Sequence, residues 1–216
     1  MKLPVERTST SGIRSATEAR AMGVAVQANL VTLRVAESRR HGSASTSYDI
    51  DVPPPGVVAH FRETLVDPKR LAQYDDAELH LRLHEVWGQF CLMRWLFGEH
   101  DDTGGANPAN VPDDAEMRCD AVIEAKLAEV HALLWRLRFE QRVRNGDCGD
   151  RFESDRTVAE TIPIEAFGQP SGECTDAELL YAACEHAGML AVLRWVTDRG
   201  RDWGDEDIMA VDPQPF

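Results

Sequence analysis

The feature that most constrains this chain is an internal repeat with a spacing of 100 residues. The segment beginning at Asp75 aligns without a gap with the segment beginning at Thr175. Nine of about 28 positions are identical, against roughly one or two expected by chance. The identical pairs are Asp76/Asp176, Ala77/Ala177, Glu78/Glu178, Leu79/Leu179, Glu85/Glu185, Gly88/Gly188, Arg94/Arg194, Trp95/Trp195 and Asp102/Asp202. This repeat predicts a fold that contains two copies of one structural unit.

Four long helices are predicted, and each has a start signal of the capping-box kind. In this pattern a Ser, Thr or Asp is followed three residues later by Glu, and the two side chains satisfy backbone amides at the helix start. Glycine, which suits the position just past a helix, follows close after each predicted end. The predicted helices are Ala16–Arg40, Asp75–Phe97, Asp113–Arg144 and Thr175–Arg199.

A short strand is predicted between the two helices of each half. Tyr48, Ile50 and Val52 alternate with acidic residues, which is typical of a half-buried strand, and the stretch from Thr157 to Ile164 alternates and is rich in β-branched residues. The predicted fold is therefore mainly α: a helical bundle from a tandem helix–strand–helix duplication, with a minor two-stranded β element. We expect the two strands to pair antiparallel across a pseudo-twofold axis.

The repeat also sets the expected organisation of the chain. We predict a flexible N-terminal tail over 1–14, a first helical half over 15–105, a second over 106–204 and a C-terminal tail over 205–216, with both halves packed as one domain. Shared residues are assigned to packing, because an active site rarely needs two copies of itself, and the glycines would allow close helix approach. The predicted repeat core consists of Leu79, Gly88, Trp95, Leu179, Gly188 and Trp195.

Composition narrows the function classes. The net charge of −14 disfavours binding to nucleic acid, because phosphate repels the whole surface, and it favours a basic protein as a partner. No apolar stretch of about 18 residues exists that would indicate a membrane span. Five cysteines, an odd number without a Cys-x-x-Cys pair, indicate reduced thiols. We therefore expect a soluble, cytoplasmic protein.

A metal site is one interpretation of the histidines. His80 and His84 are spaced i, i+4 on a predicted helix and could share a metal with Glu85 and His186. The sequence has neither the Glu-x-x-His pairs of di-iron bundles nor a His-Glu-x-x-His motif. Histidines at the edge of the core are the simpler interpretation.

Two basic clusters end the long helices that precede each repeat. Arg39, Arg40, Arg142 and Arg144 could bind phosphate or an acidic partner. Compensation of the helix dipole explains their placement more simply, because cations are favoured at the negative end of a helix.

No catalytic motif stands out, so the preferred interpretation is a non-enzymatic interaction or adaptor protein with an acidic helical surface, without a cofactor. The alternatives are a metal-dependent helical-bundle enzyme of the hydrolase type, which would use the histidine and glutamate cluster, and a structural homo-oligomer.

Overall fold

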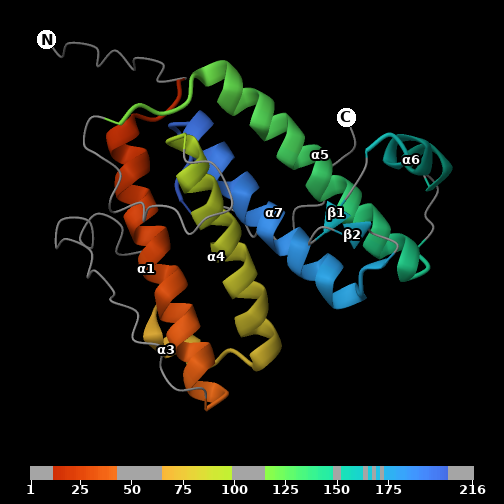
Figure 1. The fold of residues 1–216 in the computed structure, drawn as a ribbon, viewed down its shortest axis with the longest axis horizontal. Coiled ribbons are helices and arrows are strands. Elements are labelled where there is room, and N and C mark those ends of the chain that lie inside the picture. The colour runs from red at the N-terminus through yellow and green to blue at the C-terminus, as the bar shows by residue number, and fades with distance from the viewer. Residues whose placement is uncertain are drawn as a thin grey trace, which may run out of the picture.

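The computed structural model describes residues 12–42, 65–98, 115–147, 152–162, 165–166, 169–170 and 173–203. Four long helices dominate this part of the chain: α1 (Ala16–Arg40), α4 (Asp76–Leu96), α5 (Asp120–Arg144) and α7 (Asp176–Thr197). The shorter elements are α3 (Pro68–Leu71), α6 (Phe152–Ala159), β1 (Glu165–Ala166) and β2 (Gln169–Pro170). The predicted mainly helical bundle is thus confirmed (Figure 1).

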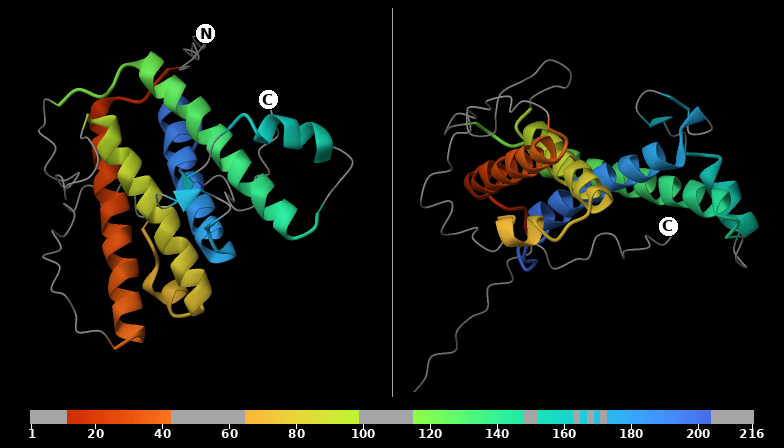
Figure 2. Two further views of the ribbon diagram at one scale, coloured as in Figure 1. Left: turned by 45° about the vertical axis from the view of Figure 1, so that its right-hand side comes forward. Right: turned by 90° about the horizontal axis from the view of Figure 1, so that it is seen from below.

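Helices α4 and α7 form the central pair, with α1 packed on α4 and α5 packed on α7. Two further views show this order after a 45° turn and from below (Figure 2). The predicted capping boxes are present at the starts of α1, α4 and α7, where Ser15, Asp75 and Thr175 accept hydrogen bonds from the amides of glutamates three residues on. Leu79 and Leu179, in the first turns of α4 and α7, are fully buried in the common core.

The central pair cross at two glycines. A Cβ atom at Gly88 would overlap the backbone carbonyl of Glu185, and one at Gly188 would overlap the backbone carbonyl of Glu85. The two contacts are reciprocal, because each glycine meets the residue three positions before the other. Backbone therefore touches backbone at this crossing, which only glycine permits.

Two arginines tie the ends of the central helices to the segments that lead into α1 and α5. Arg14 Nε donates to the Trp195 carbonyl over 2.8 Å, and its guanidinium lies 4.4 Å from the centroid of that indole ring. Arg118 Nε donates to the Trp95 carbonyl over 2.7 Å, with its guanidinium 4.7 Å from that ring. The C-terminal end of each central helix is thus held by the same kind of contact.

The start of α5 differs from the prediction. The expected capping box at Asp113 and Glu116 does not begin the helix, because residues 115–119 are non-helical and α5 starts at Asp120. The Arg118 amide donates to the Leu96 carbonyl at the end of α4. This tertiary contact, together with the one to Trp95, holds the segment in a non-helical conformation, so the helix begins only at Asp120.

The predicted strand from Thr157 to Ile164 is wrong. Residues 152–159 form α6, and residues 160–162 form a turn and a bend. The helix is favoured because it buries Asp155 and Ala159, four residues apart, while Arg136 on α5 binds the Ala159 carbonyl at its end. Strands β1 and β2 pair with each other, so the expected pairing across an axis is absent from the described residues, and the strand predicted at 48–52 lies outside them.

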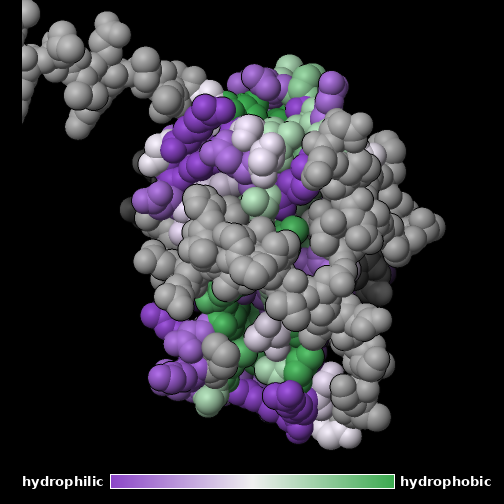
Figure 3. Space-filling view, turned by 90° about the vertical axis from the view of Figure 1, so that its left-hand side faces the viewer, coloured by the Kyte–Doolittle hydropathy of each residue, from purple (hydrophilic) through white to green (hydrophobic). Residues whose placement is uncertain are grey.

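Helix α1 lies at the outside of the bundle, yet few of its residues are exposed. Only Thr17, Arg39 and Arg40 among its residues are exposed, and Val31 and Val35 are half-buried. The side of the molecule on which α1 lies shows hydrophobic surface between groups of hydrophilic side chains (Figure 3). No described helix is long and apolar enough to cross a membrane.

Candidate functional site

The two histidines on α4 bind carboxylates on different neighbouring helices. His80 Nε2 lies 2.8 Å from Glu37 Oε1 on α1, and His84 Nδ1 lies 2.7 Å from Glu185 Oε1 on α7. The ring of Tyr181 stacks on His84, with 4.4 Å between ring centroids, and meets His80 edge-on at 6.3 Å. These contacts, the histidine links, join α1, α4 and α7.

The other two predicted metal ligands, Glu85 and His186, form hydrogen bonds within their own helices. Glu85 is buried and accepts from Arg82 on its own helix over 2.6 Å. His186 Nδ1 donates to the Ala182 carbonyl over 2.8 Å, and burial lowers the pKa of its imidazole. Within the described residues no three His, Cys, Asp or Glu side chains are grouped so as to hold a metal.

The basic clusters act inside the fold at two positions. Arg40 donates to Asp76 over 3.0 Å and to the Tyr74 carbonyl over 2.6 Å, at the start of α4. Arg144 donates to Asp176 over 2.9 Å and to the Cys174 carbonyl over 2.8 Å, at the start of α7. Each arginine therefore joins the end of one long helix to the start of the next.

The remaining two arginines of these clusters differ from each other. Arg39 is exposed, whereas Arg142 lies 3.5 Å from the buried Asp155 of α6 and places its guanidinium 5.7 Å from the Phe139 ring centroid. Arg142 therefore helps to hold α6 on α5. Binding of phosphate or of an acidic partner protein by any of these arginines stays a prediction.

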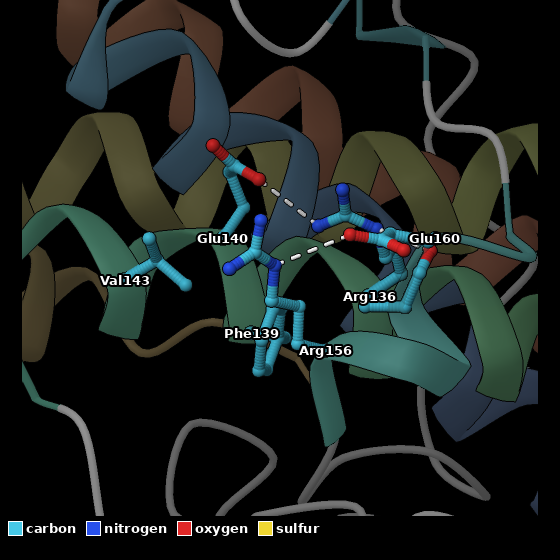
Figure 4. A pocket seen from close by; sticks show the side chains of 7 residues that line it. Arg136, Phe139, Glu140, Val143, Arg156 and Glu160 are labelled. Carbon is cyan, nitrogen blue, oxygen red and sulfur yellow. Dashed lines mark hydrogen bonds and ion pairs between the residues drawn. The ribbon is translucent and has the colours of Figure 1, made fainter. Parts of the chain in front are cut away.

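A cavity of about 350 Å³ opens between α5 and α6 and is called the α5–α6 pocket below (Figure 4). Beneath it, Trp135 stacks on Phe139 and both pack on Ala159, forming a small core separate from the main one. The apolar part of the lining comes from Phe139, Val143 and Ala159. The full lining is Arg136, Phe139, Glu140, Val143, Arg156, Ala159 and Glu160.

Two ion pairs border the pocket, and they differ in burial. Glu140 is shared by Arg136, at 3.0 Å, and Arg144, at 3.6 Å, and these three side chains are largely buried. Arg156 and Glu160 pair on α6 at 3.2 Å, with side chains that are 57% and 66% exposed. The first pair is therefore part of the wall, whereas the second can rearrange at the rim.

No family model matches this chain, and no curated protein or solved structure is significantly similar to it.

The residues that α5 contributes to the α5–α6 pocket differ from their sequence counterparts on α1, and the segment that would correspond to α6 lies outside the described residues. Helices α1 and α5 both have 25 residues, and an offset of 104 residues brings their ends together. At that offset Phe139 corresponds to Val35, and Arg136 corresponds to Thr32. The aromatic residue of the pocket floor and the arginine of its wall are thus not repeated at the corresponding positions of α1.

Sequence reasoning did not find this pocket. The two aromatic residues Trp135 and Phe139, and the acid–base pairs Arg136/Glu140 and Arg156/Glu160, are each spaced i, i+4. That spacing places each pair on one helical face. It would have marked the pocket only if residues 152–159 had been recognised as helical.

Proposed function

We propose that this protein is a non-enzymatic interaction or adaptor protein, built by tandem duplication of a helical unit, that docks a partner at the α5–α6 pocket. The duplicated halves would supply a rigid frame with an acidic helical surface. The pocket would supply the specific contact.

Contacts that recur between the halves support the duplication. Arg40 and Arg144 bind the first residues of α4 and α7 in the same way, and Arg14 and Arg118 bind Trp195 and Trp95 in the same way. The glycine contacts at the central crossing are reciprocal. A pseudo-twofold relation between two copies accounts for all three observations, because such an interface uses each contact twice.

The reactive side chains of the described core support a structural role for that core. The histidine links connect neighbouring helices, and His186 is half-buried and hydrogen-bonded to its own helix. Burial, reinforced by the charge of Glu85, raises the pKa of the Cys184 thiol to about 12, so this cysteine is a poor nucleophile. We therefore assign these side chains to the packing of the helices, and we assign partner binding to the surface.

The observation that carries the proposal is that α5 lines the α5–α6 pocket with residues that α1 does not repeat. Residues that build the frame occur in both halves, whereas Phe139 and Arg136 have Val35 and Thr32 as counterparts. A cavity with an apolar floor and a few polar groups at its border is the usual form of a binding site. Partner choice is therefore assigned to this pocket.

The test compares two tryptophan variants on the same helix. Val143→Trp fills the pocket, and Val122→Trp adds the same side chain at an exposed position near the start of α5. Each tagged protein is used to capture partners from its native lysate, with quantification by mass spectrometry and a thermal melt as the folding check. We expect a partner that wild type and Val122→Trp retain and that Val143→Trp loses. Equal capture by all three proteins would reject the pocket as the docking site.

A further inference from the structure

We propose that the α5–α6 pocket receives one apolar side chain of a partner peptide, and that the residues flanking this side chain in the peptide are basic. This inference rests on the proposed function and names the occupant of the same site.

The size and lining of the pocket fit a single anchoring side chain. About 350 Å³ is near the lower limit of small-molecule pockets, which suits one or two side chains better than a large cofactor. Phe139, Val143 and Ala159 offer an apolar surface without a hydrogen-bonding group. Binding energy at protein interfaces concentrates in such anchors, which fill a dry pocket surrounded by polar groups.

The position of the pocket at the end of α6 favours a cation beside the anchor. Ala159 is the last residue of α6 and Glu160 follows it, so the negative end of the helix dipole points to this rim. Arg136 from α5 already donates to the Ala159 carbonyl over 2.9 Å. The guanidinium of Arg136 is thus already bound at the C-terminal end of α6. A lysine or arginine of the partner would be attracted by the same helix dipole.

Glu160 is the carboxylate that a partner can reach. Its pair with Arg156 lies within one exposed helical turn, and pairs of this kind contribute little to stability. Glu160 can therefore exchange Arg156 for a lysine or arginine of the peptide. Glu140 is less available, because Arg136 and Arg144 share it in a largely buried cluster.

The overall charge of the protein also favours basic residues beside the anchoring side chain. A chain with a net charge of −14 attracts basic segments from a distance and repels acidic ones. An acidic peptide would meet Arg156 at the rim, but it would also face Glu160 and the negative end of α6, while Arg136 and Glu140 of the wall are paired with each other. Basic flanks are therefore the better complement.

The test uses three short peptides and the full-length, isotope-labelled protein. The probes are acetyl-Lys-Leu-Lys-amide, the same peptide with Ala in place of Leu, and acetyl-Glu-Leu-Glu-amide, each titrated while the methyl resonances of Val143 and Ala159 are followed by NMR. We expect saturable shifts with the first peptide and at least about tenfold weaker binding for each of the other two. Equal or tighter binding of the acidic peptide would overturn the proposal.

The two members of the exposed pair provide matched variants. Glu160→Gln removes the carboxylate, and Arg156→Gln removes its partner on the same face of α6, with little expected effect on folding because both side chains are exposed. Glu160→Gln should weaken binding of the Lys-Leu-Lys peptide severalfold, whereas Arg156→Gln should leave it unchanged or tighter. The reverse pattern would contradict the assignment of Glu160.

Failure of this inference differs from failure of the proposed function. If no peptide shifts Val143 or Ala159, but Val143→Trp still loses a partner that wild type captures from lysate, the occupant is wrong and the docking site stands. If Val143→Trp loses nothing, the docking site itself is wrong.

Discussion

Gly88 of α4 packs directly against the backbone carbonyl of Glu185 on α7. The contact joins two helices through their backbones, so neither side can yield by a change of rotamer. Interiors packed at this density respond to small increases in volume with strain. The crossing therefore fixes the distance between the two halves of the bundle.

Replacing Gly88 with alanine should destabilise the protein. Alanine gains about 1 kcal/mol in helix propensity over glycine, but its Cβ would overlap the Glu185 carbonyl. Separating the helices to relieve this overlap would disturb the central packing, so we expect a net loss of about 2 kcal/mol in the free energy of unfolding. Urea denaturation measures this loss. Gly12→Ala is the control, because its Cβ would meet open space, and equal stability of both variants would contradict the close approach.

Loss of either arginine that binds the C-terminal end of a central helix should lower the stability of the protein by a similar amount. Arg118→Ala removes a hydrogen bond to the Trp95 carbonyl and a cation–π contact, and Arg14→Ala removes the same contacts to Trp195. We expect each to lower the free energy of unfolding by about 2 kcal/mol. Because the two arginines serve different junctions, the double variant should lose about the sum.

Two further variants make this prediction specific. Arg118→Lys keeps the charge but not the planar group that binds the carbonyl and the ring, so it should recover less than half of the loss. Arg156→Ala, in an exposed pair, should change stability by about 0.5 kcal/mol or less. If Arg118→Ala matched Arg156→Ala, the tether at Trp95 would have no structural importance.

The sequence predicted those features that depend on neighbouring residues. The capping boxes at Ser15, Asp75 and Thr175 are local patterns, and the helices begin where these patterns place them. The pattern at Asp113 failed because Arg118 is held by the end of α4, a contact between segments that no local pattern reveals.

The candidate site could not be predicted for the same reason. Thr157 and Val158 favour a strand by propensity, yet the aromatic face of α5 stabilises a helix there by burying Ala159. The pocket exists only because α6 lies on α5. Its lining comes from two elements, and the sequence does not show that they meet.

Stability should fall in mild acid because of two half-buried histidines. Burial lowers the pKa of His186 and of His131 below the ordinary value of 6.5, and the charge of Arg194 adds to the effect at His131. As the pH falls below about 6.5, the unfolded chain takes up protons at these residues before the folded protein does. Unfolding is therefore favoured progressively from about pH 6.5 downward, until the folded histidines also titrate. Chemical denaturation at a series of pH values measures this slope.

The His186→Leu variant tests the origin of that slope. It removes one of the two titrating groups, so stability should depend less on pH between about 7.5 and 5 than in wild type. A second loss of stability should remain at lower pH in both proteins. It arises because capping-box hydrogen bonds lower the pKa of Glu18 and Glu178 below 4.5, and protonation removes their contribution. An unchanged slope in His186→Leu would assign the upper transition to other groups.

Thiol labelling should separate Cys119 from Cys184. Cys119 is exposed, whereas Cys184 is buried and its pKa is raised to about 12, first by burial and then by the charge of Glu85. At about pH 8 only roughly one part in 10,000 of such a thiol is ionised, and the thiolate is the reactive form. Under native conditions iodoacetamide should therefore modify Cys119 first, and Cys184 only after unfolding, as peptide mass spectrometry would show. In denaturing urea both should react at similar rates, because the unfolded chain removes the difference in burial. Modification of Cys184 alongside Cys119 in the native protein would mean that α7 opens readily, which the close crossing at Gly88 does not allow.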